Sequence, residues 1–471
     1  MTIAALTDLP ERRWLPASEA PTAALAQFAA GLNVGALSAQ ERHAAKRHLL
    51  DGLGACIAGL DEPLVRDASA LIGRLSGGGT TPIVGTADKS DLLSAVYLMA
   101  VSCHALELDD GNRAGSIHPG TVVVPALLGV GHDRNADGAS FLCAMVAGYE
   151  VAVSLAEVLH PHAGQRGFQT TGVVGALGAA AATGRLMGLD AAIMENALGV
   201  AASSGAGIFG YLSGGGNIKK LHPGHAAREG VFAALLAQAK VIEGPQSIAE
   251  TRAGIFQAFG GIYPWNGSKP GHRSGALAIT RSYLKPYPCC RHIHPAIDGL
   301  LALMDQHGFA ANDVASVEVG TYQAAMPHAT MGWESLTSAQ LSFPYVMAAT
   351  LRTGRVELDT FADTARSNPQ ILADIAKIRI AEDVECSTSY PRQGPARVTV
   401  TLANGSVHAI YVADPRGCPE LPMSDDALFD KFRMMLASRH AGSVADRLID
   451  AVWNIEIATS VRPLIDALCG R

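Results

Sequence analysis

The chain has 471 residues, and its 43 acidic and 36 basic side chains give it a formal net charge of −7. This length exceeds one ordinary domain, so we expect two domains and a large hydrophobic core. The acidic balance and the lack of a basic run argue against nucleic acid as a partner and against a basic membrane-binding face.

Targeting and membrane signals are weak in this sequence. The first residues, MTIAALTDLPERRW, do not have the charged start and long apolar core of a signal peptide. The uncharged run 167–184 consists mostly of Gly, Ala and Thr, so we expect a buried helix and no membrane span. The eight cysteines form no C-x-x-C pair, which favours a reduced, cytoplasmic protein.

Helical patterns dominate the first part of the chain. Residues 23–60 have a helical pattern, in which Ser38 and Glu41 form a capping box. Further helices are predicted at 91–105, 140–159, 174–187, 191–203 and 224–240, with Asp137 and Asp190 introducing two of them. The recurring small residues would let these helices pack closely. We assign residues 1–270 to a helical domain.

The pattern changes near Gly260, where Gly and Pro become frequent. Strands are predicted at 315–322, 396–401 and 407–412, and Asn404 and Gly405 form the turn of a hairpin between the last two. Helices are expected at 342–351 and 368–375. Residues 271–413 therefore form a smaller α+β domain, and residues 414–471, helical again, would return to the first domain. The expected fold class is mainly α with α+β.

An acidic cluster and a histidine are set between two apolar segments in the stretch 106–120, LELDDGNRAGSIHPG. Glu107, Asp109 and Asp110 precede His118, which lies in a His-Pro-Gly turn. Carboxylates and an imidazole are costly to bury without partners, so a pocket connected to solvent is their most economical location.

A second His-Pro-Gly turn follows a glycine-rich loop. Lys219, Lys220 and His222 lie there, directly before a helix. The backbone donors of the helix start and a lysine would suit an anionic group of a substrate, although a solvent-facing lysine pair is about equally compatible with the spacing. The preceding Gly205–Gly210 matches G-x-G-x-x-G, but it lacks the strand that a dinucleotide site requires, so we interpret it as a loop.

The block 285–294, KPYPCCRHIH, is the densest set of reactive side chains. Adjacent cysteines point in different directions and no spaced ligand set accompanies them, so we expect no metal. Cys290 and Arg291 instead fit the wall of a pocket for a small acidic substrate, with Arg291 holding a carboxylate. Tyr149, on the helix 140–159, is a further catalytic candidate, although a tyrosine on such a helix is more often a core residue.

Five blocks in this order resemble the MmgE/PrpD family, which includes 2-methylcitrate dehydratases, cis-aconitate decarboxylases and iminodisuccinate epimerases. They are LELDDGNRAGSIHPGTVVVPAL, GFQTTGVVGALGAAAATGRLMGL, KKLHPGHAAREGVFAALLA, KPYPCCRHIHPAIDG and SFPYVMAATL. The resemblance implies a large all-helical domain built from both chain ends, an inserted α+β lid and a homodimer. It also implies a cofactor-free site for small di- or tricarboxylates in the cleft between the domains.

Carried over by position, the resemblance places two acids of the family at Asp109 and Asp110, and Glu107 lies near the position of a further acid. The family's histidine matches His118, and its lysine matches Lys219. Two positions depart from the decarboxylases, since Gln169 and Cys290 stand where those enzymes have histidines. The spacing from Asp110 to His118 is also one residue longer. We therefore expect a reaction other than decarboxylation of cis-aconitate.

The expected function is that of a lyase that removes water from a small hydroxy di- or tricarboxylate, without a cofactor. His118 would move the proton, Lys219 would stabilise the enolate charge, and Asp109 or Asp110 would orient the histidine. The expected catalytic residues are completed by Tyr149, and the expected substrate-binding residues are Glu107, Gln169, Lys220, His222, Cys290 and Arg291. The alternatives are an epimerase of a small dicarboxylate and a non-catalytic carboxylate-binding protein.

Overall fold

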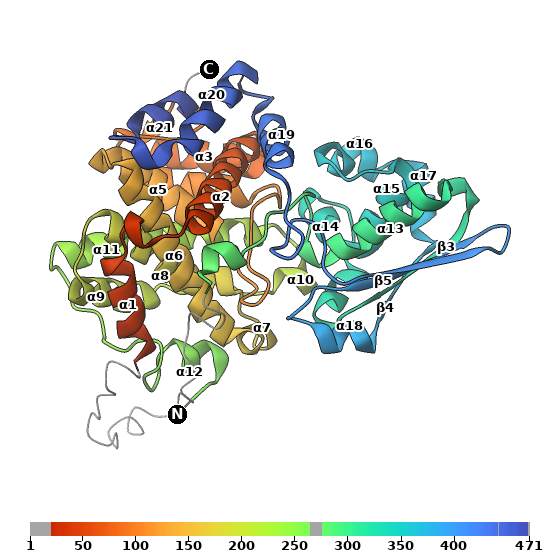
Figure 1. The fold of residues 1–471 in the computed structure, drawn as a ribbon, viewed down its shortest axis with the longest axis horizontal. Coiled ribbons are helices and arrows are strands. Elements are labelled where there is room, and N and C mark those ends of the chain that lie inside the picture. The colour runs from red at the N-terminus through yellow and green to blue at the C-terminus, as the bar shows by residue number, and fades with distance from the viewer. Residues whose placement is uncertain (1–19, 264–275, 441, 470–471) are drawn as a thin grey trace.

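The computed structural model describes residues 20–263, 276–440 and 442–469. Most of this chain folds into a helical body, which lies to the left in Figure 1. Its helices are α1 (Pro21–Gly31), α2 (Ala39–Ala58), α3 (Pro63–Leu75), α4 (Leu92–His104), α5 (Gly120–Arg134), α6 (Gly138–Leu159), α7 (His162–Gln165), α8 (Thr170–Leu186), α9 (Ala191–Ala202), α10 (Tyr211–Gly214), α11 (His222–Gln238), α12 (Ile255–Gly260), α19 (Asp425–Leu436), α20 (Gly442–Trp453) and α21 (Arg462–Cys469).

Side-chain caps determine where several of these helices begin. The Ser38 side chain accepts a hydrogen bond from the backbone of Glu41, whose carboxylate accepts one from the backbone of Ser38. Asp137 and Asp190 cap α6 and α9 in the same way, each accepting from the backbone N–H three residues further on. These bonds satisfy donors that have no partner within the helix. The predicted helix starts at these positions are confirmed.

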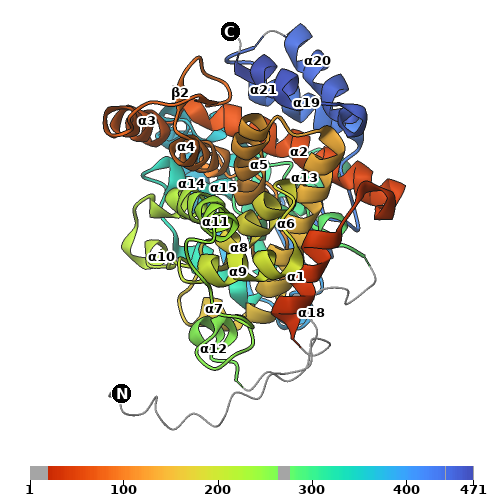
Figure 2. The same cartoon turned by 90° about the vertical axis from the view of Figure 1, so that its left-hand side faces the viewer.

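One hydrophobic core contains residues from both ends of the described chain. Leu25 and Leu49 near its start belong to the same buried cluster as Phe432 and Leu464 near its end. Helix α19 packs against α2, and α21 packs against α5. Figures 1 and 2 show these last helices, in dark blue, beside the orange and red helices from the start of the chain. The predicted helical domain built from both chain ends is therefore confirmed, while its predicted boundary at 270 lies outside the described residues.

Small residues bring α6 and α8 close together, as their recurrence in the sequence predicts. A Cβ atom on Gly148 would lie 2.9 Å from the carbonyl oxygen of Gly178, and one on Gly178 would lie 2.6 Å from the Cβ of Ala152. Larger side chains would force the helices apart. This packing buries residues 170–184 of the Gly- and Ala-rich run within helix α8.

The second unit is a four-stranded mixed sheet with its own helices, to the right in Figure 1. Its order is β4-β3-β5-β6, with β3 parallel to β4 and antiparallel to β5. Helix α13 packs on β5 and β6, and α15 packs on β4. The elements are β3 (Val314–Thr321), β4 (Ile378–Glu382), β5 (Ala396–Leu402), β6 (Val407–Val412), α13 (His294–His307), α14 (Leu336–Leu341), α15 (Phe343–Thr353), α16 (Asp363–Arg366), α17 (Pro369–Ile375) and α18 (Val384–Ser389).

This unit has a separate hydrophobic core, to which Ile297, Val317, Tyr345 and Val398 contribute. The predicted strand near 315–322 and the predicted hairpin are confirmed, and the hairpin turn falls at Asn404 and Gly405. Together the two units make the chain mainly α with an α+β part, as the sequence predicts. A minor pair, β1 (Thr81–Pro82) and β2 (Lys89–Ser90), lies on the helical body.

Within the described residues, one helix has the length and composition that would allow it to cross a membrane. It is α6, and 94% of its most apolar stretch is buried inside the protein. Its neighbours α5 and α8 cover it, so its apolar surface is accounted for by the helical core.

Candidate active site

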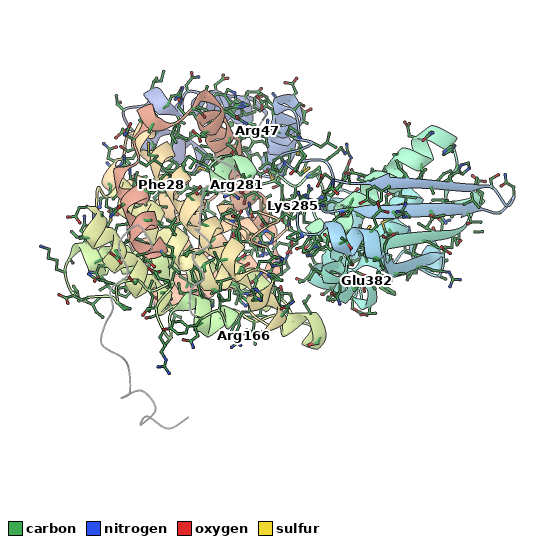
Figure 3. All side chains as sticks on the ribbon, turned by 60° about the horizontal axis from the view of Figure 1, so that its bottom comes forward. Phe28, Arg47, Arg166, Arg281, Lys285 and Glu382 are labelled. Atoms are coloured by element: carbon green, nitrogen blue, oxygen red, sulfur yellow. The ribbon has the colours of Figure 1, made fainter. Side chains whose placement is uncertain are left out.

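The acid–histidine segment joins the end of α4 to the start of α5 and lies against residues that lead into the sheet unit. Gly111 and Tyr283 exchange two backbone hydrogen bonds, of 3.1 and 2.7 Å. A Cβ atom on Gly111 would lie only 2.3 Å from the Tyr283 hydroxyl oxygen, so this close pairing requires a glycine. The pairing brings Lys285, labelled between the two units in Figure 3, up to the acidic cluster.

Glu107 is a buried carboxylate that three lysine side chains surround. Its carboxylate accepts hydrogen bonds from Lys219, from Lys220 at 3.2 Å and from Lys285 at 3.1 Å. Burial disfavours its charged form, but the three ammonium groups outweigh this and hold the pKa of Glu107 well below its usual range. Burial also lowers the pKa of Lys220 to about 8, while Glu107 and Asp109 outweigh burial and raise the pKa of Lys285.

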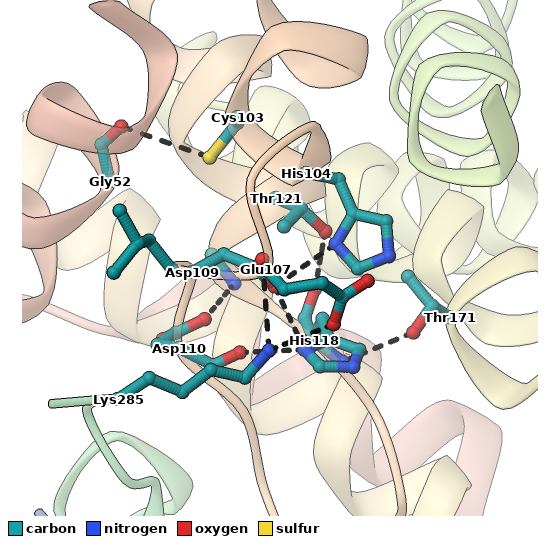
Figure 4. A network of polar contacts seen from close by, with 12 residues as sticks. Gly52, Cys103, His104, Glu107, Asp109, Asp110, His118, Thr121, Thr171 and Lys285 are labelled. Atoms are coloured by element: carbon teal, nitrogen blue, oxygen red, sulfur yellow. Dashed lines mark hydrogen bonds and ion pairs between the residues drawn. The ribbon is translucent and has the colours of Figure 1, made fainter. Parts of the chain in front are cut away.

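Asp109 connects two histidines, as Figure 4 shows. Its Oδ2 atom lies 3.0 Å from Nδ1 of His104 and 2.8 Å from Nδ1 of His118. Burial disfavours the charged carboxylate, but Lys285 and the two histidines outweigh it and lower the pKa of Asp109. Nε2 of His104 lies 3.0 Å from Nζ of Lys219. Burial, with help from Lys219, lowers the pKa of His104 to about 3, so this ring is neutral.

These contacts fix which nitrogen of each ring carries the proton. Nδ1 of His118 lies 2.8 Å from the Asp110 carbonyl oxygen as well as from Asp109, and both oxygens are acceptors. Nδ1 must therefore donate, so the tautomer that this geometry selects has its free electron pair on Nε2. His104 in turn accepts from Lys219 through Nε2 and donates to Asp109 through Nδ1.

Asp110 and Tyr149 form a support behind this group. The Tyr149 hydroxyl donates to Oδ2 of Asp110 at 2.6 Å, and the backbone N–H of Gly120 donates to Oδ1 at 2.9 Å. His48, from α2, adds a contact of 2.7 Å. Burial, together with Asp110, raises the pKa of Tyr149 well above its usual range, so its phenol keeps the proton that it donates. Both Asp110 and Tyr149 are buried and lie away from the cavity wall, which suits them to positioning rather than to contact with substrate.

A cavity of about 650 Å³ lies between the helical body and the sheet unit. Its wall includes the expected site residues Glu107, His118, Gln169, Lys219, Cys290 and Arg291, so the structure brings these distant residues together. Further polar side chains from both units complete it: Asn112, Arg113, His160, Tyr283, His292, Tyr322, His328 and Tyr390. A volume of this size fits a small polycarboxylate together with water.

The other expected binding residues contact this wall from behind. Lys220 lies between Glu107 and the side-chain oxygen of Gln340, 3.1 Å away. His222 is hydrogen-bonded through Nδ1 to the side-chain oxygen of Gln169. Burial and the nearby Lys219 lower the pKa of His222 to about 4, so the neutral ring donates to Gln169. Gln169 is thereby held at the cavity by the second His-Pro-Gly turn.

The sheet unit contributes a different wall. Sγ of Cys290 lies 3.6 Å from Nε2 of His328. Burial opposes charge on both groups, but each favours the charged form of the other, so the pKa of Cys290 is lowered and that of His328 is raised. Arg291 also lines the cavity, but its terminal nitrogens already donate to the carbonyl oxygens of Pro415 and Arg416. The expected role of Arg291 as a carboxylate clamp therefore competes with these bonds.

Several members of the site were not singled out from the sequence. His104 ends an apolar helix, and only its place directly before the acidic cluster would have indicated a role. Lys285 belonged to the reactive block but was not assigned a function. Gln340 and His328 come from segments without any local motif, so only the fold reveals them.

Comparison with known proteins finds matches for both parts of the chain. Residues 23–267 match the model of the MmgE/PrpD N-terminal domain, and residues 287–457 match that of the C-terminal domain. A cis-aconitate decarboxylase-like protein of Aspergillus oryzae is 26% identical over 95% of this chain and 97% of its own length. The cis-aconitate decarboxylase of Aspergillus terreus is 23% identical, with 95% of both chains covered. The human cis-aconitate decarboxylase is 24% identical, with 90% of both chains covered.

The two domain matches cover most of the chain and follow one another in the order that the fold shows. The resemblance read from the five sequence blocks is thereby confirmed. The chain belongs to the MmgE/PrpD family.

Proposed function

We propose that the protein is a lyase that removes water from a small hydroxy di- or tricarboxylate after abstracting a proton next to a carboxylate. The observation that supports this most directly is the placement of His118. Its Nδ1 is held by two oxygen acceptors while its ring lines the cavity, so Nε2 is the free base. A general base must reach the proton in this way and be held in the correct tautomer.

The lysines beside the cavity suit the charge that develops in this reaction. Proton removal next to a carboxylate gives an enolate, whose charge is stabilised best by fixed cations in a site with little water. Lys219 lines the cavity, and Lys220 and Lys285 lie behind it around Glu107. Three ammonium groups surround the single carboxylate of Glu107, so an anionic substrate at this part of the wall meets an excess of positive charge.

In this scheme Nε2 of His118 takes the proton from carbon, and the electrons of the C–H bond form the new C=C bond. The hydroxyl group leaves as water with a proton from the Lys219 ammonium group. Both groups return to their starting states by exchanging protons with water in the cavity. Asp109 keeps His118 oriented, and Tyr149 keeps Asp110 in place behind it.

Decarboxylation and epimerisation are the two alternatives to dehydration. Decarboxylation is suggested by the relatives, which are cis-aconitate decarboxylases. Gln169 and Cys290, at the positions of two decarboxylase histidines in the family resemblance, weigh against it. Epimerisation would need a second acid–base group on another wall of the cavity, and the pair of Cys290 and His328 supplies one.

One set of incubations separates these reactions. Purified protein is incubated in deuterium oxide with 2-methylcitrate, citrate, cis-aconitate or iminodisuccinate. A dehydratase produces new C=C absorbance from a hydroxy acid, a decarboxylase releases carbon dioxide, and an epimerase incorporates deuterium without forming an alkene. Thermal stabilisation by a carboxylate without any turnover would instead show a binding protein and contradict the proposal.

A further inference from the structure

Three side chains with transition-metal ligand atoms meet on the cavity wall that the sheet unit provides. Cys290 and His292 lie on either side of Arg291, and His328 comes from the 3₁₀ segment Gln323–Thr330 that follows β3. One ligand atom from each lies within 4.8 Å of the others. Sγ of Cys290 and Nε2 of His328 are 3.6 Å apart.

Both imidazoles are oriented from behind. Nδ1 of His328 donates to the carbonyl oxygen of Leu341 at 3.0 Å. Nδ1 of His292 lies 2.6 Å from the hydroxyl oxygen of Tyr322. With Nδ1 engaged in each ring, Nε2 is the nitrogen that can coordinate an ion, and an ion bound there would replace the present contact between Nε2 of His328 and Sγ of Cys290. Metal-binding histidines are held in this manner by a carbonyl, carboxylate or other polar group on the second nitrogen.

The cluster is also open on one side, because Cys290, His292 and His328 all line the cavity. A closed structural zinc site has four protein ligands, whereas a site that binds water or substrate has three and leaves one position free. The position left free here faces the space in which we place the substrate.

We propose that Cys290, His292 and His328 bind one divalent transition-metal ion, with the fourth coordination position open to the cavity. One thiolate and two imidazoles are a ligand set that zinc accepts. The open position would take water or a carboxylate oxygen of a small acid. This inference does not depend on the proposed dehydration, because the ion can be bound and measured without any substrate.

The geometry disfavours the other two groups of metal-ligand residues found among the described residues. In the group of His104, Asp109 and His118, Nε2 of His104 already accepts from the Lys219 ammonium group. Lys285 lies 3.9 Å from Asp109, so a metal ion would meet positive charge there.

The remaining group consists of the half-buried Asp414, the buried Cys418 and the exposed Glu420. Both of its carboxylates are already paired with Arg113. Neither this group nor the histidine–aspartate group presents a thiolate together with two imidazoles.

The spacing of residues explains why the sequence did not predict this site. The reactive block contains a second histidine, His294, two residues after His292, but His294 contacts Arg291 and the carbonyl oxygen of Cys289. The second imidazole comes from His328, 36 residues after His292 in a segment without a motif. Only the packing of that segment against the block forms the cluster.

The test uses the full chain, reduced and freed of metal with a chelator, and Co²⁺ as a spectroscopic probe. We expect one Co²⁺ per chain, with a thiolate-to-cobalt charge-transfer band and the strong visible bands of tetrahedral coordination. Zn²⁺ should displace it, and mass spectrometry of the metal should find one zinc per chain after gel filtration.

Variants locate the ion. Cys290→Ser should remove the charge-transfer band, and His328→Gln should weaken binding on the order of 100-fold, since even outer partners of a metal ligand are worth ~10–100-fold. Cys289→Ser is the matched control, because Cys289 is the adjacent buried thiol and lies outside the cluster, so binding should be unchanged. Circular dichroism confirms that each variant is folded.

Three results with the wild-type chain and the cluster variants would overturn the proposal, and a fourth would move the ion elsewhere. These are no Co²⁺ binding by the wild-type chain, binding without a thiolate band, and binding that survives both Cys290→Ser and His328→Gln. Loss of binding in His118→Asn but not in Cys290→Ser would place the ion at the histidine–aspartate group and would also contradict it. A failure to find dehydratase turnover has no bearing on these measurements.

Discussion

His118 is the residue on which the proposed chemistry depends, because it combines a fixed tautomer with access to the cavity. His118→Asn should lower kcat by about 10²–10⁴-fold, the range that a general base contributes, and should leave KM nearly unchanged. The control is His225→Gln, which changes an exposed histidine of α11 away from the cavity. Steady-state kinetics on the active substrate checks this, and full turnover by His118→Asn would exclude the scheme.

Tyr149 and Asp110 should behave as positioning residues rather than as groups that touch substrate. Tyr149→Phe removes a 2.6 Å hydrogen bond to a buried carboxylate, which should destabilise the fold by roughly 1–3 kcal/mol. We expect kcat to fall by much less than in His118→Asn and KM to stay the same. Chemical denaturation and kinetics measure the two effects, and a fall in kcat as large as that of His118→Asn would show that Tyr149 takes part directly.

The residues of the site could be predicted only where they are close together in the sequence. Glu107, Asp109 and His118 stand out because three charged or titratable groups interrupt an apolar region. His328 could not be joined to them in advance, since its contact with Cys290 depends on how its segment packs within the sheet unit.

At the level of elements, the start of α5 connects the site to the helical core. Gly120 is the first residue of α5, and a Cβ there would lie 2.6 Å from Oδ1 of Asp110 and 2.8 Å from the Tyr149 hydroxyl. Gly120→Ala should therefore displace Asp110 and lower both stability and turnover, although alanine usually favours a helix. Gly73→Ala is the control, because nothing lies within 4 Å of a Cβ at that exposed position of α3.

The two glycine substitutions should change the stability of the protein in opposite directions. Gly73→Ala should stabilise the protein by about 0.5–1 kcal/mol through helix propensity alone. Gly120→Ala should lower the melting temperature and the rate together. Equal stability of the two variants would mean that the close contact at Gly120 relaxes without effect and that this helix start does not position Asp110.

Helices that begin with a side-chain cap, and segments with a regular pattern of hydrophobic residues, were predicted well. Elements without either signal were not. Asp137 and Asp190 fix helix starts through their own side chains, so local sequence was sufficient. Helix α8 begins at Thr170, four residues before the predicted start, because its Thr and Gly residues do not favour a helix without the packing of α6. Strand β4 was missed, since it is a short edge strand with no buried face and its parallel pairing with β3 is set by tertiary structure.

For the molecule as a whole, buried neutral histidines should make stability depend on pH. Burial, with Lys219, lowers the pKa of His104 from 6.5 to about 3, so the native ring stays neutral where the unfolded ring takes up a proton. Because the unfolded state then binds more protons, the free energy of unfolding is largest above pH 6.5 and falls as pH decreases toward 3. His160 and His222, whose pKa values burial lowers to about 4, contribute in the same direction.

The contribution of His104 to this pH dependence of stability can be isolated with His104→Gln. The glutamine side chain can still donate a hydrogen bond to Asp109 and accept one from Lys219. Between pH 5.5 and 4, each proton taken up only by the unfolded state contributes about 1.4 kcal/mol per pH unit. The slope of unfolding free energy against pH should therefore be smaller by roughly this amount in the variant. Urea denaturation at several pH values measures both slopes. Equal slopes would show that His104 is protonated in the native protein. Nε2 of His104 could then not accept the hydrogen bond that we assign to the Lys219 ammonium group.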